Sequence, residues 1–189
     1  MSFIFRELDL TQYHEAGHAI AFYLYSFRPI RIAGATTEHD RRSTAFFRTR
    51  GALLESPLAR QRAQNYAVCC IAGIAAESKF SGVSLADLRR LSGKDDYEVV
   101  HAIGHRLAIC GGIGWCPEVK AAHVDLWEAQ AVALMRQPQI WAAVESLYWD
   151  LHMSGGELER GDLIAAIEHA LDEGLEVLNM GATGIYSRA

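Results

Sequence analysis

Apolar residues recur every three to four positions along most of the chain, which is the spacing of an amphipathic helix. The stripe formed by Val99, Val100, Ile103 and Leu107 is a clear example. This pattern, read together with helix start and stop signals, predicts helices over residues 11–27, 56–82, 84–91, 95–110, 118–137, 138–153 and 162–173. We therefore expect a mainly α-helical protein.

Local signals mark the ends of the predicted helices. Thr11 is the predicted N-cap of the first helix, and Ser56-Pro57 is a typical start because a proline at the first helical position loses no hydrogen bond. The helical period disappears over residues 29–50, where residues 30–32 alternate and residues 43–48 are rich in strand formers. This segment predicts a β-hairpin or small sheet, and the expected fold class is mainly α (α+β).

The composition is typical of one globular domain. The chain has 189 residues, of which 50% are hydrophobic and 22% charged, with only four prolines. We treat residues 1–189 as a single domain, with an N-terminal extension over residues 1–10 and a loosely held tail over residues 175–189.

Charge and hydropathy bear on partners and location. A net charge of −5 gives no reason to expect nucleic acid as a partner. No apolar run approaches the roughly 18–20 residues of a membrane span, and the N-terminus lacks the apolar core of a signal peptide. We therefore expect a cytoplasmic protein without a membrane span.

The segment His14-Glu15-Ala16-Gly17-His18 is an HExxH sequence on the first predicted helix. Residues four apart share one face of a helix, so both imidazoles can reach one metal ion, and zinc suits imidazole ligands. Glu15 is placed to accept a proton from a metal-bound water. The predicted helix start puts this motif near the first turn, where the helix dipole favours neutral His and ionised Glu. The alternative is that both histidines are ordinary helix residues.

Small residues accompany the motif. Gly17 costs about 1 kcal/mol relative to alanine inside a helix, but with Ala16 and Ala19 it forms a surface that another backbone can approach closely. Residues 72–76 (Ala-Gly-Ile-Ala-Ala) form a second such surface. We predict that these two helices cross at short range and hold the metal-binding helix rigidly.

These segments resemble the peptidase domain of the FtsH family, the membrane-anchored AAA+ zinc proteases. Residues 13–19 (Tyr-His-Glu-Ala-Gly-His-Ala) are similar to the zinc motif of the family. Residues 72–77 resemble its alanine-rich helix that ends in Ala-Ala-Glu, and residues 92–97 resemble its Ser-Asn-Asp segment. The likeness covers about residues 10–175.

The resemblance implies a zinc metalloendopeptidase with one Zn²⁺ per chain. His14 and His18 would be metal ligands, with Asp96 as the third ligand, and Glu15 would be the catalytic base. Where the family has Asn-Asp, this chain has Asp95-Asp96. Asp95 is therefore the alternative third ligand; if Asp96 ligates, Asp95 can cap the following helix.

Other polar residues are weaker candidates for a role at the metal site. Glu77, at the end of the alanine-rich helix, either orients a metal ligand or forms an ordinary ion pair. His101 and His105 are also four residues apart, but no glutamate accompanies them, and we expect them to be ordinary helix residues.

The resemblance to zinc peptidases also suggests a function for the strand-like segment, which is substrate binding. Zinc peptidases bind an extended substrate along a strand edge, and the candidate edge here is Thr44, Ala45, Phe46 and Phe47. The alternative is that the segment only packs its phenylalanines on the core.

The sequence contains no G-x-x-x-x-G-K-[ST] phosphate-binding loop. We therefore expect a domain that acts without the ATPase module and membrane anchor of the family, with a separate ATPase or further copies of the chain as candidate partners. The predicted function is hydrolysis of peptides or unfolded proteins through a zinc-activated water. The alternative function is a catalytically inactive, protease-like zinc-binding interaction module.

Overall fold

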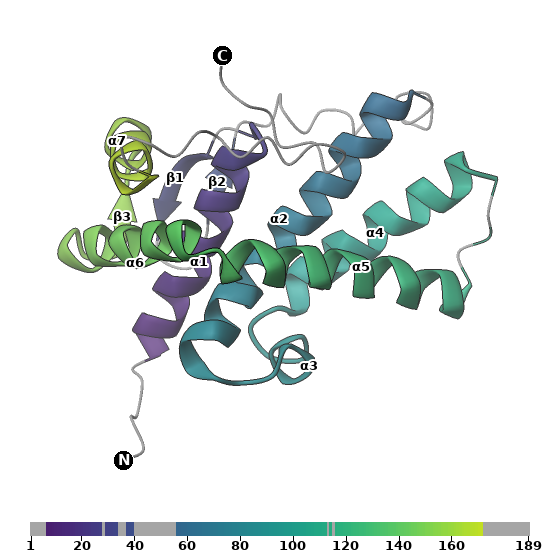
Figure 1. Ribbon diagram of the computed structural model, residues 1–189, viewed down its shortest axis with the longest axis horizontal. Helices are drawn as coiled ribbons and strands as arrows, with labels where there is room; N and C mark the ends of the chain where they lie inside the picture. Colours follow the sequence, from purple (N-terminus) through teal and green to yellow (C-terminus); the bar gives the residue numbers. More distant parts are fainter. Residues whose placement is uncertain are drawn as a thin grey trace.

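The computed structural model describes residues 7–27, 29–33, 37–39, 56–112, 114 and 116–171 (Figure 1). Its helices are α1 (Glu7–Leu24), α2 (Pro57–Ser81), α3 (Leu85–Leu88), α4 (Lys94–Cys110), α5 (Pro117–Arg136), α6 (Pro138–Met153) and α7 (Arg160–Leu171). Its strands are β1 (Pro29–Ala33), β2 (Thr37–His39) and β3 (Glu157–Leu158). The prediction of a mainly helical fold with a small sheet is confirmed.

Helices α1 and α2 cross at the centre of the molecule (Figure 1). The crossing is close because Gly17 lies against α2: a Cβ atom there would be 2.7 Å from the Ala72 carbonyl oxygen and 2.7 Å from the Ala76 Cβ. The side chains that line this crossing are fully buried: Ile20 of α1, and Ile71, Ala72 and Ala76 of α2. The predicted short-range crossing of the two helices is confirmed.

The ends of α2 follow the sequence signals. The Ser56 side chain accepts a hydrogen bond from the backbone N–H of Ala59 at 3.1 Å, and Pro57 occupies the first helical position. At the other end, Gly82 adopts a left-handed conformation with φ of 75°, which costs glycine little. Helix α2 therefore runs across the core with both ends capped.

The sheet has three strands in the order β2-β1-β3, and both pairs are antiparallel. The hairpin of β1 and β2 lies within the segment predicted to be strand-like. Strand β3 comes from the chain between α6 and α7, where Leu158 pairs with Ile32 of β1. Two residues are too short to show an alternating pattern, so the sequence did not predict this strand.

The remaining helices flank the crossing on two sides. Helices α4 and α5 extend from one side of α2, while α6, α7 and the sheet lie on the side of α1 (Figure 1). Stacked aromatic rings join α1 to α6: the Tyr13 ring centroid is 4.3 Å from that of Tyr148 and 3.8 Å from that of Phe80 on α2. The Tyr13 ring of α1 is therefore held between α2 and α6.

The first helix begins earlier than predicted. It starts at Glu7, and the Thr11 hydroxyl donates to the Glu7 carbonyl oxygen at 3.1 Å inside the helix, so the prediction of Thr11 as N-cap is wrong. Residues 7–10, expected to belong to an extension, form the first turn. The predicted tail over residues 175–189 lies outside the described residues. Within the described part of the chain, no helix is long and apolar enough to cross a membrane.

Candidate metal centre

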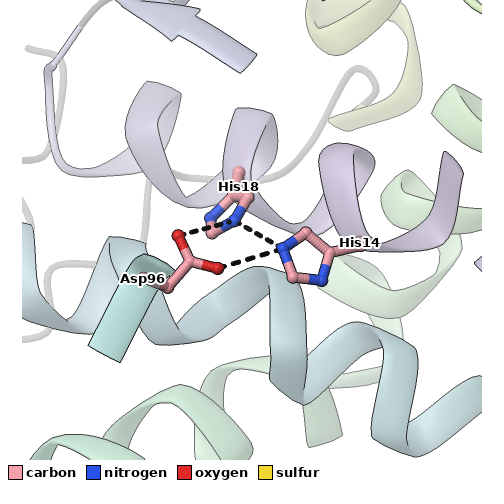
Figure 2. Close-up of side chains that lie close together, drawn as sticks. All are labelled: His14, His18 and Asp96. Carbon is pink, nitrogen blue, oxygen red and sulfur yellow. Dashed lines mark hydrogen bonds and ion pairs between the residues drawn. The ribbon is translucent and has the colours of Figure 1, made fainter. Parts of the chain in front are cut away.

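His14 and His18 point to the same place from one face of α1. Both are buried, and their Nε2 atoms are only 2.9 Å apart (Figure 2). Asp96, in the first turn of α4, completes the group: its Oδ2 is 3.1 Å from the Nε2 of His14, and its Oδ1 is 3.5 Å from the Nε2 of His18. One ligand atom of each residue lies within 4.8 Å of the others, so this group could hold a metal ion.

The hydrogen bonds made by the two Nδ1 atoms determine that the Nε2 atoms face the centre as acceptors. The Nδ1 of His14 is 3.0 Å from Oε2 of Glu77, and the Nδ1 of His18 is 2.8 Å from the carbonyl oxygen of Cys69. A carboxylate and a carbonyl only accept hydrogen bonds, so both Nδ1 atoms donate. In a neutral ring, Nε2 then carries the lone pair, and this is the arrangement found for histidines that bind metals.

This arrangement fits a cation. Two neutral imidazoles cannot hydrogen-bond each other through Nε2, because neither atom carries a proton. The 2.9 Å approach of these atoms, with an Asp96 oxygen beside them, needs a positive charge between them, either a proton or a metal ion. Two imidazole nitrogens and one carboxylate oxygen are ligands that suit Zn²⁺. The donor set therefore fits the predicted zinc ion, although other divalent metals also bind such ligands.

The pKa values of His14, His18 and Asp96 also show that this site favours a positive charge. Burial lowers the pKa of His14, but hydrogen bonds to Asp96 and Glu77 outweigh burial and raise that pKa to about 10. The pKa of His18 is also raised despite burial, mainly through the negative charge of Asp96. Burial raises the pKa of Asp96, but the charge of His18 and the hydrogen bond to His14 hold that pKa well below its usual range. A metal ion must therefore displace protons from this site.

Space for the imidazoles comes from Gly73 on α2. A Cβ atom at this position would lie 2.5 Å from the Nε2 of His18 and 2.8 Å from the Cδ2 of His14. The helix that carries Glu77 and the Cys69 carbonyl thus also leaves room for both rings. Helix α2 therefore supplies two hydrogen-bond acceptors and the space that the rings occupy.

Glu77 contacts more than one part of the site. It is 4% exposed, and its Oε2 also accepts a hydrogen bond from the Ser92 hydroxyl at 2.7 Å. Ser92 lies in the turn between α3 and α4, four residues before Asp96. Glu77 thus contacts the His14 ring directly, and this contact is compatible with both alternatives, a carboxylate that orients a metal ligand and an ion pair with a protonated histidine. The contribution of Ser92 was not predicted, because its partner is 15 residues away in the chain.

A cavity of about 510 Å³ adjoins the centre on the side of His14 and Glu15. The side chain of Glu15 is nearly buried, with 4% of the residue exposed, and its charge contributes to the raised pKa values of both histidines. The cavity is also lined by apolar side chains, which are Leu10, Val83, Leu88 and Leu91. A molecule in this cavity would therefore contact both a metal ligand and a carboxylate.

The helix-dipole argument from the sequence does not hold. Because α1 begins at Glu7, His14 and Glu15 lie about two turns inside the helix, and the influence of the dipole is confined to the first turn. The charge states at the centre depend instead on neighbouring side chains and on burial. The two histidines of the motif do belong to a group that could hold a metal ion, but the sequence-based explanation of their charge states was wrong.

The other predicted site residues lie elsewhere. Asp95 is exposed in the first turn of α4; it is not the N-cap, which is Gly93, and it does not belong to the candidate metal group. His105 is exposed and His101 is partly buried on α4, and neither belongs to this group. The candidate substrate strand, Thr44 to Phe47, lies outside the described residues. The structure therefore brings together His14, His18 and Asp96, with Glu15 and Glu77 beside them.

Comparisons with known proteins return no match: no family model and no curated protein matches the sequence, and no solved structure matches the fold.

Proposed function

We propose that the protein is a zinc-dependent peptidase of the HExxH type. The observation that carries the proposal is the approach of two imidazole Nε2 atoms to 2.9 Å beside Asp96, with both Nδ1 atoms held by acceptors. The resemblance of the motifs to the FtsH peptidase domain supports the same assignment. The outer hydrogen bonds would orient the rings before a metal binds, so little reorganisation would be needed.

The composition of the site favours a catalytic metal over a structural one. Structural zinc sites are usually closed by four protein ligands, whereas catalytic sites use three and leave one position open. In the described part of the chain, the candidate group contains three side chains, and a cavity of about 510 Å³ begins next to one of them. Such a cavity gives a substrate access to the site.

A zinc ion held by His14, His18 and Asp96 would supply Lewis-acid chemistry, polarising a carbonyl group and acidifying a water molecule. Glu15 would take the proton of the attacking water on its carboxylate and then donate it to the leaving amine. The apolar walls of the cavity would bind an apolar substrate side chain and exclude water from it. Glu77 would hold the His14 ring in place during both steps.

The decisive test separates metal binding from hydrolysis. Bound zinc and cleavage of casein are measured for the wild type and for Glu15→Gln, which keeps the shape of the side chain but removes the base. We expect one zinc per chain in both proteins, and cleavage at least about 100-fold slower in the variant, since a positioned general base contributes roughly 10²–10⁴-fold. The matched control is Glu98→Gln, an exposed position two residues after Asp96, which should cleave like the wild type.

Two other outcomes would overturn the proposal. A wild-type protein that holds zinc but cleaves neither casein nor unfolded peptides would be a zinc-binding interaction module. Equal cleavage by the wild type and Glu15→Gln would exclude Glu15 as the base.

A further inference from the structure

The position of Asp96 depends on the start of α4. Its carboxylate contacts His14 and His18, which it would share with a metal. The N-cap residue of α4 is Gly93, which makes no side-chain capping hydrogen bond. Neither the carboxylate itself nor a helix cap therefore explains how the first turn of α4 is held in place.

A buried contact holds one side of this turn. Gly93 packs so closely on α2 that a Cβ atom there would overlap the side chain of Ile74. Its backbone N–H also donates to the Leu88 carbonyl oxygen at 3.0 Å, which closes the turn after α3. These contacts set how near the turn comes to α2. Further along α4, the buried side chains of Val100, Ile103 and Leu107 pack in the core.

Another contact, on α5, holds the first turn of α4 on the side of Tyr97. Glu128 Oε1 accepts hydrogen bonds from both the Arg89 guanidinium and the Tyr97 hydroxyl. The Arg89 guanidinium also lies 4.7 Å from the centroid of the Tyr97 ring, so the three side chains form one closed cluster. Tyr97 is only 3% exposed and the Glu128 side chain is 16% exposed, whereas the Arg89 side chain is 37% exposed. The contact between Tyr97 and Glu128 is therefore shielded from solvent, and Arg89 covers it from the partly exposed side.

The cluster contacts both ends of the segment that brings polar groups to the metal centre. Arg89 follows α3 directly, and Tyr97 follows Asp96 directly. Between them lies Ser92, which donates to Glu77. Glu128 therefore anchors both ends of residues 89–97 to α5, and α5 packs along α2, the helix that carries Glu77 and contacts both histidines.

We propose that Glu128 is a positioning residue for the metal centre: through Tyr97 and Arg89 it sets the orientation of α4 at which the Asp96 carboxylate reaches His14 and His18. This inference rests on the proposed function for the metal but does not require hydrolysis. It predicts that a residue on α5, outside the metal group, controls metal affinity through one particular ligand. A side chain that only stabilised the fold would not act through one ligand.

The test measures zinc affinity by competition with a chelator, together with the visible absorption of the Co²⁺-loaded protein. Glu128→Ala is expected to raise the Kd for zinc about tenfold, the lower end of the range for residues that orient metal ligands. It should also change the Co²⁺ spectrum, because the carboxylate ligand moves. Asp125→Ala, an exposed acidic position one turn earlier on α5, is the matched control and should behave like the wild type.

Repeating the measurement in the Asp96→Asn variant identifies the metal ligand through which Glu128 acts. In Asp96→Asn, the charged carboxylate is already gone, so adding Glu128→Ala should not weaken zinc binding further. If Glu128→Ala does not fold, Glu128→Gln and Tyr97→Phe replace it, since each keeps the packing and removes a charge or one hydroxyl. The two together should weaken binding no more than the stronger of them alone.

Three results would count against these assignments, and they can be told apart. Unchanged zinc affinity in both the Glu128 and Tyr97 variants overturns the inference alone. An equal loss of affinity in the wild-type and Asp96→Asn backgrounds also overturns it, because the effect would not pass through Asp96. A wild-type chain that binds zinc tightly but cleaves nothing overturns the peptidase proposal, while the affinity ratios still decide the role of Glu128.

Discussion

The crossing of α1 and α2 and the segment of residues 89–97 bring ligands to the same point in different ways. At the crossing, glycines at positions 17 and 73 let two helices and two imidazoles approach closely. In the segment, long side chains reach across to α5, and Arg89, Tyr97 and Glu128 hold the turn through charge and hydrogen bonds. The crossing depends on the absence of side-chain volume, whereas the segment combines one such position, Gly93, with side chains that contact α5.

This difference predicts different responses to substitution. Close packing leaves no room for an added atom, so a single methyl group should disrupt the crossing. A polar cluster keeps most of its packing when one charge or hydroxyl is removed, so its losses should be graded. The two histidines are thus held in a nearly fixed arrangement, whereas the position of Asp96 can be adjusted by mutation.

The largest effect is expected at Gly73. Gly73→Ala places a Cβ atom 2.5 Å from the Nε2 of His18 and 2.8 Å from the Cδ2 of His14, so the imidazoles must move away from this position. We expect zinc affinity to fall at least about 100-fold, more than for residues that only orient ligands, and the free energy of unfolding to fall by about 1–3 kcal/mol. A zinc titration and urea denaturation measure the two quantities.

Gly161→Ala on α7 is the matched control, because a Cβ atom there meets nothing within 4 Å. It should leave zinc binding unchanged and alter stability by less than about 1 kcal/mol. Wild-type zinc affinity in Gly73→Ala would show that the crossing is not the rigid part of the site.

An intermediate effect is expected at Glu77, which connects the two regions. Glu77→Gln keeps an oxygen that can accept from His14 but loses the negative charge, and we expect zinc affinity to fall about tenfold. Ser92→Ala removes only the hydrogen bond from the turn, so its effect should be smaller than that of Glu77→Gln. Isothermal titration calorimetry with zinc measures both, and a larger loss in Ser92→Ala would contradict this order.

The last effect is a slope of stability with pH, which is gradual because it is spread over several pH units. In the metal-free protein, the pKa of His14 is raised from 6.5 to about 10, so the folded state holds a proton that the unfolded state loses between these values. The contribution of His14 to stability should therefore be highest below pH 6.5 and fall as pH rises toward 10. The fall is at most about 1.4 kcal/mol per pH unit for one proton.

Zinc should reverse the sign of this slope. With free zinc held constant, the folded state carries the metal in place of the proton, while the unfolded histidines take up protons below pH 6.5. Stability should then rise with pH up to about 6.5 and level off. Thermal unfolding across pH, with and without zinc, measures both slopes, and the same slope in the two series would mean that metal and proton do not compete for His14.

Much of the fold followed from local signals. Helix α6 has the predicted bounds, and the Ser56-Pro57 start and Gly82 end of α2 were predicted because caps depend on residues next to one another in the chain. The start of α1 was misplaced by four residues because Thr11 fits a cap but forms a hydrogen bond inside the helix instead. Strand β3 was missed because it exists only through pairing with β1, which is distant in the chain.

The amino-acid sequence by itself determined the pair of histidines and the carboxylate between them, since the spacing of four residues on a helix places His14 and His18 on one face. Small residues on two segments also indicated that these segments could approach closely. These features are local, and the backbone geometry of a helix is enough to establish them.

The rest of the centre arose only when the chain folded. Glu77, Ser92 and the Cys69 carbonyl reach it from distant parts of the chain, and Asp96 rather than Asp95 faces it because of the rotation of α4. Glu128 had no signal in the sequence, since its role depends on the packing of α5 beside α4. Such contacts depend on how helices are oriented in space, and the spacing of residues along a single helix carries no information about that orientation.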